Sequence, residues 1–134
     1  EGGADVLWVE TISAPDEYKA AAEAAAAGPR LAGKRLCITS PVTVVFGLEG
    51  FGVAPAGTVK EKTGHHHLII DAPLPDLGKP IPANEHYIHF GGGQTQTTVE
   101  LSPGGHTLQL LLGDHAHMPH AEPVYSDVVT ITVE

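Results

Sequence analysis

Histidine is the residue in this chain whose number and spacing point to chemistry. Nine histidines occur in 134 residues, and most of them fall in three short motifs. Residues 63–71 read TGHHHLIID, residues 85–90 read EHYIHF, and residues 114–120 read DHAHMPH. Imidazole titrates near neutral pH and is the commonest metal ligand among side chains. The motifs therefore indicate a metal site or another ligand site, although any single histidine could equally serve as a hydrogen-bonding or solvent-facing residue.

The type of metal follows from the other donors near these rings. Imidazole suits copper, zinc and nickel, and the thioether of Met118 adds a preference for reduced copper. The motifs contain no cysteine, which argues against a structural zinc site or an iron–sulfur cluster. Copper is the first choice and zinc the second. The expected metal ligands are His65, His67, His89, His115, His117 and His120.

The strand period of two predicts where the rings of the first two motifs point. One row of the first motif consists of His65, His67 and Ile69, and the other consists of His66, Leu68 and Ile70. Rings two residues apart on one strand are separated by about 6.6 Å at their Cα atoms, so both can lean onto one ion. We expect His66 on the core row, and His86 and His89 on opposite faces. Because a ligating histidine must be neutral, metal affinity should fall as the pH drops through about 6.5.

Composition limits the class of protein that carries these motifs. The formal net charge is −9, which disfavours nucleic acid and acidic membrane surfaces as partners. No apolar run is long enough to span a bilayer, and 42% hydrophobic residues suit one soluble domain. The 16 glycines and 11 prolines are enough to supply many turns between short strands.

Short segments of strand character follow one another without helices between them over most of the chain. The expected strands are residues 5–12, 42–48, 65–71, 85–90, 96–102, 106–113 and 128–134. Turn sequences such as PDLGKP, GGG and SPGG separate them. This order predicts an all-β fold, an immunoglobulin-like antiparallel β-sandwich, with a small barrel as the alternative.

The N-terminal part differs from the rest and predicts a strand-plus-helix extension. Residues 5–12, DVLWVETI, read as a strand, and SAPD at 13–16 is a helix-start sequence. The alanine-rich run that begins at Ala14 predicts a helix that ends at Gly28-Pro29. We therefore divide the chain into an extension of residues 1–35, docked lightly on the body, and a His-rich domain of residues 36–134.

The body of the chain also resembles a known bacterial family. Three segments are similar to the family catalogued as domain of unknown function 4399. They are VTVVFGLEGFGVAPAGTVKEKTGHHHLIID, the segment from IPANEHYIHFGGGQT to HTLQLLLGDHAHMPH, and VYSDVVTITV. The resemblance covers about residues 36–134 and implies a small, exported protein, periplasmic or secreted, with an immunoglobulin-like sandwich. The histidines that match its motifs are His65, His66, His67, His89, His106, His117 and His120.

Three functions are compatible with these features. The first is an exported metal-binding module for copper binding or delivery. The second is a structural or assembly module, in which the strand residues Val6, Leu7, Trp8 and Val9 contact another protein through an exposed sheet edge. The third, an enzyme, ranks last because the chain has no nucleophile elbow and no phosphate-binding glycine loop, although Asp114 or Glu85 could orient ligands of a catalytic metal.

Overall fold

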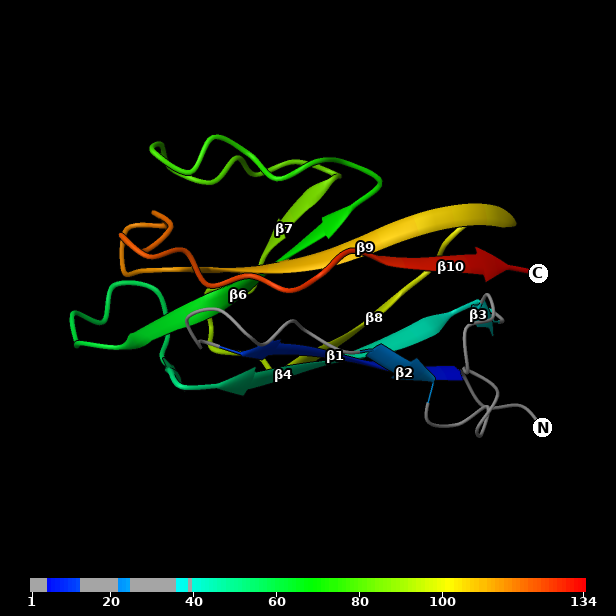
Figure 1. Ribbon diagram of the computed structural model, residues 1–134, viewed down its shortest axis with the longest axis horizontal. Coiled ribbons are helices and arrows are strands. Elements are labelled where there is room, and N and C mark those ends of the chain that lie inside the picture. Colours follow the sequence, from blue (N-terminus) through cyan, green and yellow to red (C-terminus); the bar gives the residue numbers. More distant parts are fainter. Residues whose placement is uncertain (1–4, 13–21, 25–35, 39) are drawn as a thin grey trace.

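Two β-sheets that face each other make up the protein (Figure 1). The computed structural model describes residues 5–12, 22–24, 36–38 and 40–134. One sheet has four strands in the order β2-β1-β4-β8 and the other has six, with β3-β10-β9-β6-β5 in line and β7 also paired with β6. The strands are β1 Asp5–Ile12, β2 Ala22–Ala24, β3 Leu36–Ile38, β4 Val42–Glu49, β5 Gly52–Val53, β6 Thr63–Ile70, β7 Tyr87–His89, β8 Gln96–Val99, β9 Gly104–Gly113 and β10 Val129–Val133.

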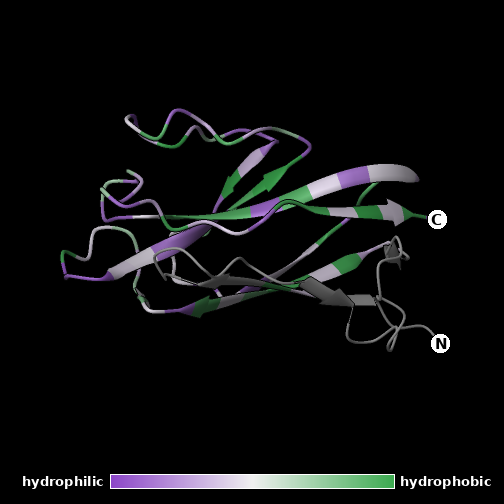
Figure 2. Ribbon diagram, in the orientation of Figure 1, coloured by the Kyte–Doolittle hydropathy of each residue, from purple (hydrophilic) through white to green (hydrophobic). Residues whose placement is uncertain are grey.

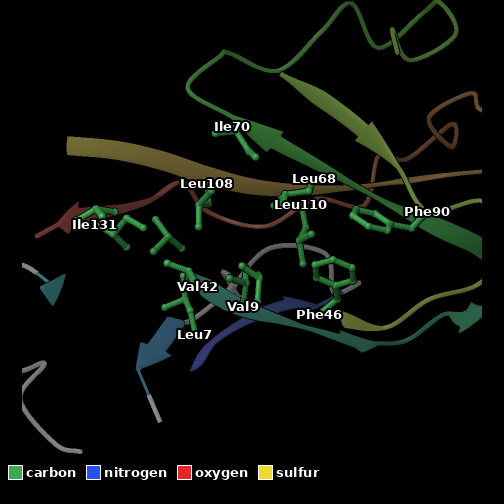
Figure 3. Packing of buried hydrophobic residues seen from close by; sticks show 13 residues of the cluster. Leu7, Val9, Val42, Phe46, Leu68, Ile70, Phe90, Leu108, Leu110 and Ile131 are labelled. Carbon is green, nitrogen blue, oxygen red and sulfur yellow. The ribbon is translucent and has the colours of Figure 1, made fainter. Parts of the chain in front are cut away.

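The main hydrophobic core fills the space between the two sheets (Figure 3). Period-two alternation on each strand sends one row of side chains into this space, as β4 shows with Val42, Val44 and Phe46 buried. From the opposite sheet come Leu68 and Ile70 of β6 and Leu108 and Leu110 of β9. His66 lies on the same row of β6, as expected, and its ring centroid is 5.0 Å from that of Phe46. The outer face of β6 is thereby left to His65 and His67.

The prediction of an all-β fold is confirmed, but the pairing is not purely antiparallel. Three pairs run parallel: β1 with β4, β10 with β3, and β5 with β6. The expected helix from Ala14 to Gly28 lies mostly outside the described residues. Its described part, Ala22–Ala24, is strand β2 paired with β1, so the helix prediction is wrong there. Within the described ranges, no helix is long and apolar enough to cross a membrane.

Strand β1 is an inner strand of its sheet. It pairs with β4 along its whole length, from Asp5 to Ile12, and with β2 at Leu7–Val9 on its other side. Leu7 and Val9 are fully buried in the main core, and Trp8 between them is exposed. Over Leu7–Val9 the backbone donors and acceptors on both sides have partners, so β1 is not the free edge that strand addition requires. The division of the chain at residue 35 and contact with another protein through this strand stay predictions.

An ion pair between Asp71, just after β6, and His106 of β9 links these two strands, and we call it the histidine clasp. The Nδ1 of His106 donates to Oδ2 of Asp71 at 2.7 Å, and its Nε2 donates to the carbonyl of Ser102 at 2.8 Å. Two acceptors require both ring nitrogens to carry hydrogen, which only the imidazolium form provides. The hydrogen bond to Asp71 raises the pKa of His106, and burial works against it. The other oxygen of Asp71 accepts the backbone N–H of Thr107.

We expect this clasp to add stability at acidic to neutral pH and to lose it in alkali. Because the folded pKa of His106 is raised above 6.5, its contribution is complete below that value and is lost as the pH rises through the folded pKa. His106→Gln should reduce the free energy of unfolding by about 1–2 kcal/mol at pH 6 and by less at pH 9. Urea denaturation at the two pH values measures this. An equal loss at both would show that the charge of His106 contributes nothing.

Candidate metal centre

Three separate segments bring imidazole rings together on the outer face of the six-stranded sheet. The row of β6 that faces away from the core supplies His65 and His67, both fully buried. His89 of β7 is the direct neighbour of His67 in the antiparallel β6–β7 pair. The loop after β9 supplies His117, which is half-buried. Figure 2 shows the hydrophilic stretch near the beginning of β6, where the histidines lie, and the hydrophobic stretch toward its end.

The spacing of the rings suits one metal ion. His65, His67 and His117 each offer a ligand atom, and the three atoms lie within 4.8 Å of one another. The Nε2 of His65 and the Nδ1 of His117 are 3.0 Å apart and share a hydrogen bond. Two nitrogens bound to one tetrahedral ion are roughly 3.3 Å apart, so little movement separates this arrangement from a ligated one. We call these three residues the histidine trio.

Backbone carbonyls fix the orientation of the neighbouring rings. His67 donates its Nδ1–H to the carbonyl of Leu111 at 3.3 Å, which leaves the lone pair on Nε2. His89 donates its Nε2–H to the carbonyl of Pro82 at 2.7 Å, which leaves the lone pair on Nδ1. Metal-ligating histidines typically donate their other ring N–H to a carbonyl or carboxylate in this way. Two of the rings are therefore already in the tautomer that a metal ion requires.

Two buried nitrogens of the trio lack a partner. Among the described residues, neither Nδ1 of His65 nor Nε2 of His67 has a hydrogen-bond partner, and both are out of contact with solvent. A buried polar atom without a partner is costly, and such atoms in native proteins are rare. A bound metal ion would give Nε2 of His67 a partner, because Nδ1 of that ring already donates to Leu111; if His65 binds the ion through Nε2, the atom beside His117, its Nδ1 carries the hydrogen instead.

The rings of the trio are held in the neutral form. Burial, followed by the neighbouring rings of His117 and His89, lowers the pKa of His65 to about 4. Burial, and then His89 and His65, lowers the pKa of His67 to about 3. The pKa of His117 is lowered by burial and by His89. Neutral imidazole is the form that binds metals, so the cluster is ready for ligation at neutral pH.

A tight loop places His117 over β6. The Oδ1 of Asp114 accepts the backbone N–H groups of Ala116 and Met118, and the N–H of His117 donates to the carbonyl of Asp114. His117 itself has φ 63°, a left-handed conformation that costs a residue with a Cβ about 1 kcal/mol or more. The loop holds this strained residue where its ring meets His65.

The segment of residues 72–86, between β6 and β7, covers the same face, and we call it the strap. It extends above β7 and β9 in Figure 1. Ile81 of the strap is buried and forms a second apolar cluster with Ile69 and Leu111. The N–H of Ile81 donates to the carbonyl of His117 at 2.8 Å, and the carbonyl of Pro82 accepts from His89. The strap therefore bonds the ring of His89 and the backbone of His117.

The other expected ligands lie apart from the trio. His115 is exposed, and its carbonyl accepts the N–H of Gly57. His120 donates its Nε2–H to the carbonyl of Thr63, and its ring packs edge-on against Phe51 at 4.8 Å. Their role as ligands stays a prediction. His86 is exposed and bonds the carbonyl of Ile70, on the opposite side of β7 from the cluster, as the alternation predicts.

Several residues that build the site have no chemical signal in the sequence. Pro82 and Leu111 bond the rings through backbone carbonyls, which any residue could supply. Ile81 reads as an ordinary apolar residue in a proline-rich turn. The PDLGKPIP composition indicated a turn, and nothing in it marked the turn as a cover for the histidines.

Comparison with known proteins places the body of the chain in a family. A family model described as "Domain of unknown function (DUF4399)" matches residues 44–134, which include the whole histidine cluster. The search of curated proteins and the search of solved structures gave no match. The immunoglobulin-like relationship of the sandwich therefore stays a prediction.

Proposed function

The chain belongs to the family described as Domain of unknown function (DUF4399), and we propose that it is a metal-binding module whose site is the histidine trio. The description assigns no activity, so the proposal rests on the site. The observation that carries it is the convergence of three neutral imidazoles whose ligand atoms lie within 4.8 Å of one another, with the buried Nε2 of His67 lacking a partner among the described residues. A purely structural role would leave that nitrogen of His67 unpaired, which costs free energy.

Copper is the metal that the donor set favours. Three imidazole nitrogens suit copper and zinc, and copper(II) binds nitrogen sites more tightly than the other divalent first-row ions. A two- or three-coordinate imidazole site also suits copper(I), and the Met118 thioether, next to His117 in the chain, would add to that preference. We propose copper first and zinc second, with binding or delivery of the ion as the role.

An exported location, in the periplasm or outside the cell, is part of the same proposal. Its support is the resemblance to an exported family and not a feature of the fold. The site itself refines the expected dependence on pH. Because the pKa of His65 and His67 is lowered to about 4 and about 3, protons compete with the metal well below pH 6.5. Affinity should therefore change little between pH 8 and about 6.

Metal titration of two matched variants tests the proposal. Untagged protein is stripped of metal and titrated with copper(I), copper(II) and zinc(II), with the stoichiometry determined by elemental analysis. His117→Asn removes a ligand of the trio, and asparagine tolerates the left-handed backbone at this position. Loss of an outer-sphere partner already costs about 10–100-fold in affinity, so we expect a loss of about 100-fold or more.

His115→Asn is the control, because it removes an exposed imidazole from the same loop two residues away. It should bind one ion per chain as tightly as the wild type. Weak binding of several ions, lost equally in both variants, would mean surface coordination and would overturn the proposal. Tight binding that survives in His117→Asn would place the site elsewhere.

A further inference from the structure

A fourth imidazole completes the group around the histidine trio. The ring centroid of His89 is 4.3 Å from that of His67 and 4.7 Å from that of His117. Within the trio the centroid distances are 4.5, 4.8 and 5.7 Å. Rings of four histidines around one tetrahedral ion have centroids roughly 5 Å apart. Five centroid distances thus already bracket the spacing of a four-histidine site.

His89 has the chemistry of a ligand, but its ligand atom is not within the 4.8 Å group of the trio. Its Nε2–H is held by the carbonyl of Pro82, so Nδ1 carries the free lone pair. To reach an ion bound by the trio, the ring must move inward. The hydrogen bond to Pro82 lies on the side of the ring away from that lone pair, so it can be kept during the movement.

The strap is hydrogen-bonded to both residues whose rings would approach each other, His89 through its ring and His117 through its backbone. Pro82 accepts from the ring of His89, and the neighbouring Ile81 donates to the backbone of His117. Ile81 also packs on Ile69 and Leu111 under the strap. Any movement of His89 toward His117 is therefore transmitted to Ile81 and Pro82, two adjacent residues of the strap.

We propose that His89 is a closing fourth ligand, and that its approach to the ion tightens the strap of residues 72–86 over the site. This inference rests on the proposed function and adds to it a conformational signal. Divalent zinc or copper, which favours four ligands, draws in His89, whereas copper(I) is satisfied by the trio. The strap is on the surface, so its state reports to the outside which ion the site holds.

X-ray absorption and hydrogen exchange on the full chain test this inference. With zinc(II), the wild type should show four nitrogen ligands and slower exchange of the strap amides than in the metal-free protein. His89→Ala should bind zinc with three nitrogens and one oxygen from solvent, about 10–100-fold more weakly, and its strap should not respond to metal. His115→Asn, which removes an exposed imidazole outside the strap, should behave as the wild type.

The outcomes separate this inference from the proposed function. Three nitrogens in wild-type zinc protein, with equal affinity in His89→Ala, would overturn the closing ligand and leave the trio intact. The same would follow from strap exchange that slows equally in His89→Ala. Zinc and copper affinities that are unchanged in His117→Asn would instead overturn the trio as the metal site, and the closing ligand with it.

Discussion

Replacing Gly113 with alanine is expected to displace the ring of His67 from the histidine trio. A Cβ at Gly113, the last residue of β9, would lie 2.5 Å from Cε1 and 3.2 Å from Nδ1 of His67, and 3.1 Å from Cδ1 of Ile81. His67 is fully buried among the other rings, so it has no free space to move into. Overpacking of this kind costs about 1–3 kcal/mol of stability. The hydrogen bond of His67 to Leu111 should also break.

Metal affinity should fall with the displaced ring, by about 100-fold, since the loss of an orienting partner alone costs about 10–100-fold. Urea denaturation and a copper titration of the same sample measure both effects. Gly105→Ala is the matched control, because it lies on the same strand and a Cβ there meets nothing within 4 Å. It should bind metal normally and be unchanged or more stable by about 0.4–1 kcal/mol. Normal metal affinity in Gly113→Ala would show that His67 is not a ligand.

The face of each strand histidine could be predicted from the sequence, because the strand period of two is a local property. Alternation from Ile69 correctly placed His65 and His67 together, and His66 with Leu68 in the core. The convergence of these rings with His89 could not be predicted. It depends on β6 pairing with β7 in the register that sets His67 opposite His89, and pairing between strands is not encoded in either strand alone.

The loop histidines show the limit most clearly. His115 and His117 are two residues apart, like His65 and His67 on β6, and both were expected to bind metal. The left-handed conformation of His117 turns its ring onto His65, while His115 remains exposed. The bonds from Asp114 that set this turn are specific to the loop geometry. The parallel pairing of β1 with β4 was missed for a related reason, because hydrophobic alternation fixes a buried face and not a neighbour.

The three buried histidines of β6 should make the metal-free protein unfold in mild acid. Burial lowers the pKa of His65 and His66 to about 4 and of His67 to about 3, whereas the unfolded chain takes up these protons near pH 6.5. Below pH 6.5 the unfolded state therefore binds more protons than the folded state, and stability falls with the pH. Each histidine contributes up to about 1.4 kcal/mol per pH unit. Together the three remove about 4 kcal/mol per pH unit below 6.5, so a stability near the lower end of the usual range, about 5 kcal/mol, would be exhausted by roughly pH 5.

One of these histidines can be replaced without changing the histidine trio. His66 points into the core, and its buried Nε2 has no partner among the described residues, so His66→Leu replaces a polar atom by an apolar group of similar size. We expect this variant to keep its copper affinity, and the slope of unfolding free energy against pH below 6.5 to fall by about one third. Urea denaturation at pH 7.5, 6.0 and 5.0 without metal measures the slope. If the free energy of unfolding falls with the same slope in His66→Leu and in the wild type, His66 does not make the fold sensitive to acid. The sensitivity must then come from the other histidines, those of the trio and the strap.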